Sequence, residues 1–264
     1  IRSAHSVAGN LKSGKTQLEE IINKIIEIAD EKKLSAKPLW TEPLKETIYL
    51  SECVDKINTN SFENCWDEDS DISATLGMVD IIETQKQIPL NISLPQSGHI
   101  AVYGSSGTGK TTLLQTIIFS LTTKYSPEML NIFAFDFGGR NLGNLSLLPH
   151  CVNVAFGDEE DKISYMFEQI LECIETRKVL FAKNNCAAYE SYLATTKNKL
   201  PAVLLVLDNY AVFREKMFRN EDDLIRIAAN AKAYGIYLIV TGNSKNAIYY
   251  KVSEHISNNI TLRM

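Results

Sequence analysis

One short segment constrains the fold of this chain more than any other, because it fits the pattern G-x-x-x-x-G-K-[ST] between two apolar runs. The segment consists of Gly104, Ser105, Ser106, Gly107, Thr108, Gly109, Lys110 and Thr111. The run 99–103 before it predicts a strand, and the run after it predicts a helix over 111–123. Small residues let consecutive backbone N–H groups turn toward a phosphate, while the helix N-terminus and a lysine offset its charge. We therefore expect these eight residues and Thr112 to bind a triphosphate.

A second segment, 9–16, matches the same pattern and serves as a control on it. It reads GNLKSGKT, but the residues before it include no apolar run that would form the strand preceding a phosphate-binding loop. The apolar residues after it recur at helical spacing and predict an amphipathic helix from Thr16 to Lys33, capped near Thr16. We therefore expect Lys15 to be a solvated residue of a linker.

Charge and cysteine usage exclude several classes of protein. The net charge is −5, and the acidic residues cluster in segment 63–71, which we interpret as a solvated loop. Proteins that bind DNA through its phosphates concentrate Lys and Arg on one face, and no such concentration is visible here, so we expect no nucleic acid partner. The five cysteines include no C-x-x-C pair, which argues against a disulfide framework and a zinc site. The apolar runs are all shorter than a membrane span.

The chain divides into two parts by its pattern. Residues 1–70 read as a lead-in helix followed by an extended linker, and residues 71–264 read as an α/β domain. Continuous apolar runs of this kind are typical of a parallel sheet buried on both faces. The expected strands are 99–103, 130–136, 152–156, 202–208 and 236–241, and the expected helices are 111–123, 160–184 and 220–233. Because the chain begins at Ile1 without a methionine, we expect it to be part of a longer protein.

Asp208 supplies the second element that a nucleotide-hydrolysing site requires. It ends the buried run 202–208, where a carboxylate can orient Mg²⁺ together with the Thr111 hydroxyl. The alternative is that Asp208 caps the next helix. The run 130–136 also ends in an aspartate, Asp136, so a strand is inserted between the loop and Asp208. That order favours a RecA-like P-loop NTPase, with a mainly parallel sheet flanked by helices, over a simple kinase.

Asn209 is the main departure from an active hydrolase. In RecA-like ATPases a glutamate commonly follows the Mg²⁺ aspartate and deprotonates the attacking water, but an amide cannot accept a proton near neutral pH. Loss of a general base removes roughly 10²–10⁴ in rate, or about 3–5 kcal/mol of barrier. Nucleotide binding should persist while hydrolysis is weak, which leaves open whether the chain is an enzyme. Asp136 or a residue of a neighbouring subunit could replace the missing base.

Several separated motifs resemble those of the FtsK/SpoIIIE ATPases. They are DFGG at 136–139, ETRKVLF at 175–181, the segment 189–192, ANAKAYGIYLIVT at 229–241 and NITLR at 259–263. Three further motifs resemble the EssC/EccC branch of type VII secretion ATPases, namely WTEPL at 40–44, LGMVD at 76–80 and QIPL at 87–90. The resemblance runs from about residue 37 to the end of the chain.

This resemblance implies more than the residues alone do. It implies ATP and Mg²⁺ as cofactors, tandem ATPase modules in one chain, and a hexamer at the cytoplasmic face of the cell membrane that exports WXG100-type proteins. Asn209 fits a later module with altered catalytic motifs. Thr241 matches a γ-phosphate sensor, although Gly242-Asn243 stands where the translocases carry Gln-Arg. Arg140 and Arg263 are candidates for arginines that act on phosphate or on a neighbouring subunit.

Three functions remain at this point. The first is an ATP-binding module of a type VII secretion ATPase with weak hydrolysis. The second is a DNA translocase, which the acidic balance opposes. The third is a structural docking module for an exported protein with a vestigial nucleotide site, which the presence of Lys110, Thr111 and Asp208 opposes.

Overall fold

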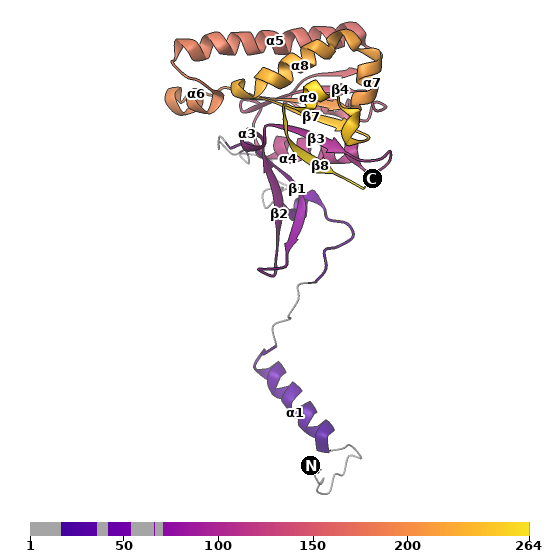
Figure 1. Ribbon diagram of the computed structural model, residues 1–264. Coiled ribbons are helices and arrows are strands. Elements are labelled where there is room, and N and C mark those ends of the chain that lie inside the picture. The colour runs from indigo at the N-terminus through magenta and orange to yellow at the C-terminus, as the bar shows by residue number, and fades with distance from the viewer. Residues whose placement is uncertain (1–16, 36–41, 54–65, 67–70, 264) are drawn as a thin grey trace. The chain divides into compact units, whose positions relative to one another are not determined.

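The structure is a computed structural model that describes residues 17–35, 42–53, 66 and 71–263 (Figure 1). The chain forms two compact units, one of Ile1–Pro43 with Ile82–Lys86 and one of Leu44–Ile81 with Gln87–Met264. The second loop pattern at 9–16 lies outside the described residues, as does most of the acidic segment 63–71. Within the described residues, none of the helices is long and apolar enough to cross a membrane.

A parallel sheet forms the centre of the larger unit. Its strands lie in the order β5-β4-β6-β7-β3-β8, and each neighbouring pair is parallel. Their bounds are β3 His99–Tyr103, β4 Leu130–Asp136, β5 Cys151–Phe156, β6 Ala202–Asp208, β7 Ile236–Gly242 and β8 Ile256–Thr261. Every residue of β3, β6 and β7 is buried, as expected for strands covered on both faces. Asp136 pairs in register with Asp208, so both carboxylates reach the same edge of the sheet.

Helices cover both faces of this sheet (Figure 1). Alternate residues of β3 point to opposite faces. Ile100 and Val102 pack in a core with α4, while Ala101 and Tyr103 pack in a second core with α5, α7, α8 and α9. The bounds are α4 Lys110–Lys124, α5 Glu160–Lys183, α6 Tyr189–Thr196, α7 Tyr210–Lys216, α8 Glu221–Asn230 and α9 Tyr250–Ser253. The predicted α/β fold with a parallel sheet flanked by helices is confirmed.

The element boundaries follow the sequence prediction closely within the sheet. The strands predicted at 99–103, 130–136 and 202–208 have those bounds, while β5 begins one residue earlier and β7 ends one residue later than predicted. The helix predicted over 220–233 is shorter, because α8 ends at Asn230 and the chain continues as a 3₁₀ turn, Ala231–Tyr234. Gly235 follows with φ of 70°, a conformation that favours glycine and ends the turn before β7.

A β-hairpin before the sheet was not predicted. It consists of β1 (Ser73–Ile81) and β2 (Lys86–Ser93), and the short helix α3 (Leu94–Ser97) connects it to β3. Apolar residues alternate in β2 at Ile88, Leu90 and Ile92, but the strand escaped prediction because Pro89 interrupts it and most of it is exposed. The Thr75 N–H donates a hydrogen bond of 2.7 Å to the Ser120 hydroxyl of α4, which ties β1 to the domain.

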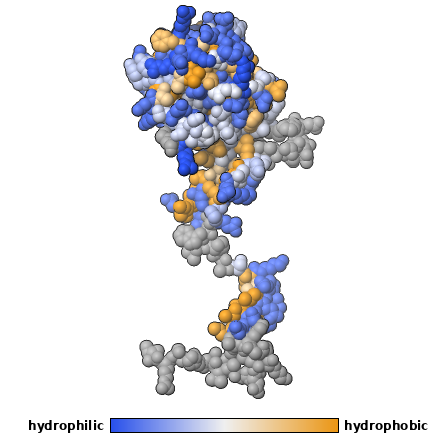
Figure 2. Space-filling model, turned by 90° about the vertical axis from the view of Figure 1, so that its right-hand side faces the viewer, coloured by the Kyte–Doolittle hydropathy of each residue, from blue (hydrophilic) through white to orange (hydrophobic). Residues whose placement is uncertain are grey.

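The lead-in contains the amphipathic helix that the sequence predicted. This helix, α1, runs over Gln17–Glu31, within the predicted 16–33, and the single turn α2 (Leu50–Cys53) follows later in the chain. Figure 2 shows the hydrophobic stripe along α1 beside its charged face. The side chains of the stripe are all exposed, namely Leu18, Ile21, Ile22, Ile25, Ile26 and Ile28.

Candidate functional site

The loop between β3 and α4 has the backbone that a phosphate-binding turn requires. Gly107 and Gly109 adopt φ of 78° and 95°, which side chains with a Cβ rarely permit. Thr108 closes the turn, because its hydroxyl donates to the Ser105 carbonyl at 2.9 Å. Gly104 allows this closure, since a Cβ there would lie 2.5 Å from the Thr108 hydroxyl oxygen. The loop therefore forms a tight turn that ends at the start of α4.

The start of α4 is a site for negative charge. Among the residues that the structure describes, no side chain caps the helix there, and the first N–H groups of a helix have no partner within it. These groups and the helix dipole favour an anion at this end. The ammonium of Lys110, the first residue of α4, donates to the carbonyls of Gly104 at 2.7 Å and Ser105 at 2.9 Å. Both partners are neutral, so the lysine charge remains available to a phosphate.

Three side chains from different elements form a hydrogen-bonded chain below the loop. Asp208, at the end of β6, accepts hydrogen bonds on both carboxylate oxygens. The Thr111 hydroxyl of α4 donates to Oδ2 at 2.8 Å, and the Thr241 hydroxyl of β7 donates to Oδ1 at 2.6 Å. Asp208 is only 2% exposed and Thr241 is fully buried. The carboxylate is therefore fixed in position by two neutral donors.

Thr111 and Asp208 fit a magnesium ion. Hydroxyl and carboxylate oxygens are hard ligands, and Mg²⁺ commonly takes one or two of them together with phosphates and water. Its Mg–O distance of about 2.0–2.1 Å places neighbouring ligands of an octahedron about 2.9 Å apart. The separation between the Thr111 and Asp208 oxygens is 2.8 Å. The hydroxyl can donate to Asp208 and still offer a lone pair to a metal.

Asn209 follows Asp208 in a left-handed conformation, with φ of 68°. Its N–H donates to the Thr241 hydroxyl at 2.8 Å, so Thr241 joins the backbone of Asn209 to the Asp208 carboxylate. Asparagine tolerates this conformation better than most residues do. The side-chain amide lines the cavity described below, and its Nδ2 lies 3.4 Å from the Phe137 carbonyl. It can hold a water molecule by hydrogen bonds but cannot take its proton.

Asp136 does not offer an unengaged carboxylate to replace the missing base. It is 2% exposed, and both of its oxygens accept backbone hydrogen bonds of 2.8 Å, from the N–H groups of Gly138 and Leu142. These bonds stabilise the turn after β4, and the Phe137 N–H donates to the Asp208 carbonyl at 3.1 Å, which joins the turn to the end of β6. Gly138 is required at this point, because a Cβ there would lie 2.6 Å from the Asp208 Oδ2 atom.

A cavity of about 390 Å³ brings most of the predicted site residues together. Of these, the lining contains Ser106, Gly107, Gly109, Lys110, Thr111, Thr112, Asp208 and Asn209. Gly104, Ser105 and Thr108 shape the loop instead, and Thr241 lies behind Asp208. Sequence reasoning missed two lining residues as site residues, Gly138 and Asn243. Gly138 belongs to the DFGG motif, and Asn243 belongs to the Gly242-Asn243 pair that stands where the translocases carry Gln-Arg. The sequence therefore contained a signal for both residues.

The two candidate arginines lie outside this lining. Arg140 is paired with Asp158 at 2.6 Å, and its guanidinium lies 4.4 Å from the centre of the Phe156 ring. Arg263 is exposed, and its backbone carbonyl accepts a hydrogen bond from the Ser105 N–H of the loop at 3.3 Å. Neither guanidinium reaches the cavity in this structure.

Comparison with known proteins identifies the family of this chain. The model of the FtsK/SpoIIIE family matches residues 62–264, which is most of the chain. The chain belongs to the FtsK/SpoIIIE family. This FtsK/SpoIIIE chain is homologous to EssC/EccC proteins over most of its length, which confirms the resemblance seen in the motifs.

One curated relative is the type VII secretion system protein EssC of Staphylococcus aureus strain MRSA252, 31% identical over 255 residues. The match covers 95% of the FtsK/SpoIIIE chain and 17% of EssC, so the chain spans about a sixth of that relative's length.

Two solved structures are also similar to the FtsK/SpoIIIE chain. The cytoplasmic domain of the type VII secretion ATPase EccC of Thermomonospora curvata matches with a TM-score of 0.77 and 25% identity, covering 91% of this chain and 30% of that one. ATPases 2 and 3 of the same EccC, in complex with a signal sequence peptide, match with a TM-score of 0.70 and 27% identity, covering 76% and 38%.

Proposed function

We propose that this chain is an ATP-binding module of a type VII secretion motor ATPase. The observation that carries the proposal is the Thr111–Asp208–Thr241 chain beneath an amide-rich loop with Lys110. One cavity combines an anion-binding loop, a lysine and a pair of oxygen ligands for a metal, and this combination argues against a vestigial nucleotide site. Membership of a P-loop family supports nucleotide binding in general, and the residues present fit ATP with Mg²⁺.

Each residue has a distinct role in this proposal. The amides of 104–112 and the Lys110 ammonium bind the phosphates, and Thr111 and Asp208 hold Mg²⁺, which would neutralise charge on the phosphates when bound. Hydrogen bonds from two hydroxyls hold the Asp208 carboxylate in place. Thr241 positions Asn209 through the backbone N–H. Asn209 orients water without deprotonating it.

Weak hydrolysis follows from the same residues. Asn209 has no proton-accepting form near neutral pH, and Asp136 is engaged by two backbone amides. ATP would therefore act mainly by setting conformation and subunit contacts, while a base from a neighbouring subunit could restore turnover in an assembly.

The wider setting of the module is part of the proposal. We propose that 71–264 form the ATPase module and 1–70 its lead-in, within a longer chain that carries other ATPase modules. The homology to EssC and EccC supports a place at the cytoplasmic face of a bacterial membrane, assembly as a hexamer, and export of WXG100-type proteins through recognition of a signal sequence.

The chain provides a matched control for testing the nucleotide site. Lys110→Ala removes the lysine of the loop before α4, while Lys15→Ala makes the same change in the second copy of the pattern. A ligand at 100 times its dissociation constant stabilises a protein by about 2.7 kcal/mol. We expect Mg·ATP to raise the midpoint of thermal unfolding in the unmodified protein and in Lys15→Ala, and to have little effect on Lys110→Ala. Equal stabilisation of Lys110→Ala would refute the site assignment.

A further inference from the structure

A second cavity lies at the same edge of the sheet as the nucleotide site. Its volume is about 340 Å³, within the range of ligand-binding pockets. Its lining comes from the last residue of β3, from α7, α9 and β8, and from the segment that follows β7. None of its lining residues lines the nucleotide cavity, so the two are separate sites.

Tyr103 contributes a hydroxyl without a hydrogen-bond partner to this cavity. Tyr103 ends β3, packs in the core beneath α7, α8 and α9, and is only 2% exposed, so its ring is fixed in position. Among the described residues its hydroxyl has no hydrogen-bond partner, and the oxygen is not sealed within the core. A tyrosine hydroxyl at a buried position usually has a partner. The Tyr103 hydroxyl is therefore available to a ligand in the cavity that it lines.

Two cationic side chains line the cavity, and none of its lining residues is acidic. The Arg214 guanidinium lies 4.7 Å from the centre of the Tyr249 ring, and its Nε forms an ion pair with Glu221 of α8 at 3.0 Å. Lys245 is exposed, and it has no ion pair or hydrogen bond with the described residues. Lys251 lies 5.9 Å from the same ring centre but does not line the cavity. Within the lining, the Lys245 ammonium is thus the cation that has no counter-charge among the described residues.

The same lining also offers apolar surface. The rings of Tyr249 and Tyr250 meet edge to face, with centres 4.8 Å apart and planes at 70°. Tyr250 is 62% exposed, so much of its ring is free to contact a ligand, and Ile248 precedes this pair in the lining. A lone carboxylate or phosphate group would leave these rings uncovered. A ligand that fits the whole cavity must therefore join an anionic group to an apolar one.

We propose that this cavity binds a carboxylate that carries an apolar or aromatic group. The Lys245 ammonium pairs with the carboxylate, and the Tyr103 hydroxyl donates a hydrogen bond to one of its oxygens. The apolar group contacts the rings of Tyr249 and Tyr250. Because Glu221 already compensates Arg214, one uncompensated cation remains in the lining, which suits a singly charged carboxylate better than a doubly charged phosphate. The site uses none of the residues that bind nucleotide in the proposed function.

The test supplies this carboxylate from two sources, a free organic acid and a peptide. The acid is 3-phenylpropionate, with 3-phenylpropionamide as its neutral control, and the peptide is acetyl-Phe-Asp-Phe-amide, with Asn in place of Asp as its control. Each is titrated into the ¹⁵N-labelled full chain, and the backbone amide resonances of 245–250 are followed. We expect saturable shifts from at least one carboxylate with a dissociation constant below about 1 mM, and binding of its neutral control that is weaker by about tenfold or more. Saturation by the peptide alone would support a protein chain as the source, and saturation by the acid alone would support a small organic acid.

Three results would overturn the proposal. They are no saturation by either carboxylate, equal affinity for a carboxylate and its neutral control, and saturation of the same resonances by inorganic phosphate at a lower concentration than by either carboxylate. Lys110→Ala should leave carboxylate binding unchanged, so a failure of this proposal is distinguishable from a failure of the proposed nucleotide site.

Two variants separate binding from a structural role. Lys245→Gln should weaken carboxylate binding about fivefold or more, while Lys183→Gln, which makes the same change of charge at an exposed position of α5, should leave it unchanged. Tyr103→Phe removes a hydroxyl that has no partner to lose, so it should leave the free energy of unfolding unchanged. It should weaken binding about tenfold, because a hydrogen bond to a charged group is lost. Unchanged affinity in both Lys245→Gln and Tyr103→Phe would refute the assignment of these two groups and the proposal with it.

Discussion

Replacing Thr241 with valine removes the hydroxyl that links Asp208 to the backbone of Asn209, with little change in side-chain shape. The donated bond to a carboxylate, 2.6 Å long, is of a kind worth about 1.5–3 kcal/mol. The Asn209 N–H, which now donates to Thr241 at 2.8 Å, would lose its partner at a cost of about 1–3 kcal/mol. Because the two bonds belong to one network, they do not add fully, and we expect a loss of about 3 kcal/mol of unfolding free energy.

Urea unfolding measures this loss, and Thr241→Ser is the matched control. Serine keeps the hydroxyl and deletes one buried methyl group, which costs about 0.5–1.5 kcal/mol. Valine should therefore lower the free energy of unfolding more than serine does, at an unchanged dependence on urea. If serine destabilises the protein as much as valine, the hydrogen bonds of Thr241 contribute less than the structure indicates and the reasoning is wrong.

Three further changes test other parts of the account. Asn209→Glu should raise the rate of ATP hydrolysis by up to about 10²–10⁴-fold. The left-handed backbone conformation at this position should cost the glutamate roughly 1–2 kcal/mol of stability. An unchanged rate in a phosphate-release assay would mean that a missing neighbouring subunit limits hydrolysis. Gly138→Ala places a Cβ 2.6 Å from the Asp208 carboxylate, so it should weaken Mg·ATP binding in a calorimetric titration. Gly143→Ala is the control and should leave binding unchanged, because its Cβ would lie 3.5 Å from the nearest atom. Burial lowers the pKa of His99 from 6.5 to about 4. Between these pH values His99 takes up a proton in the unfolded chain but not in the folded one. The free energy of unfolding should therefore fall by up to about 3 kcal/mol as the pH drops from 6.5 to 4. A His99→Gln variant should lose that part of the pH dependence in urea unfolding, and an identical pH profile would exclude His99 as its source.

The central strands β4, β6, β7 and β3 could be predicted because they are buried on both faces, whereas the half-exposed edge strand β8 was not among the predicted strands. Such strands are continuous apolar runs, and those of β4 and β6 end at Asp136 and Asp208. The hairpin of β1 and β2 gives no comparable signal, since β2 is mostly exposed and a proline interrupts it. The 3₁₀ turn after α8 also escaped prediction. Residues 231–234 favour a helix, and the helical pattern of the sequence continues until Gly235.

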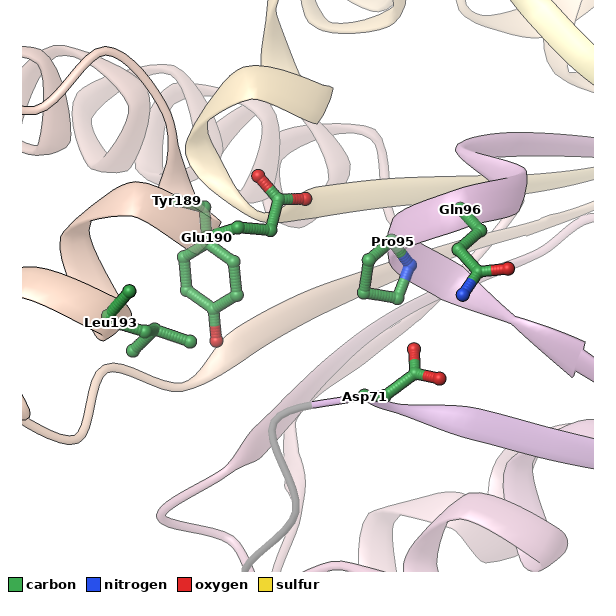
Figure 3. A pocket seen from close by; sticks show the side chains of 7 residues that line it. Asp71, Pro95, Gln96, Tyr189, Glu190 and Leu193 are labelled. Atoms are coloured by element: carbon green, nitrogen blue, oxygen red, sulfur yellow. The ribbon is translucent and has the colours of Figure 1, made fainter.

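The candidate site was predictable where chemistry fixes the residue type. Lys110, Thr111 and Asp208 stand in patterns that specify charge and oxygen ligands, and the structure brings all three into one cavity. Gly138 is harder to find, because its importance lies in the space it leaves beside Asp208, and space is not encoded by a pattern within one segment. A further cavity, lined by residues of α3 and α6 (Figure 3), is equally hard to find, since these residues lie more than 90 positions apart in the sequence.

A paramagnetic metal locates the bound nucleotide on the protein. Mn²⁺ in place of Mg²⁺ broadens nuclear resonances near it, so titration of the ¹⁵N-labelled chain with Mn·ATP marks the residues around the metal. The account predicts that broadening centres on 106–112 and 208–209 and that Lys110→Ala abolishes it. Broadening centred on the loop 9–16, or none at concentrations that saturate a nucleotide site, would contradict the account.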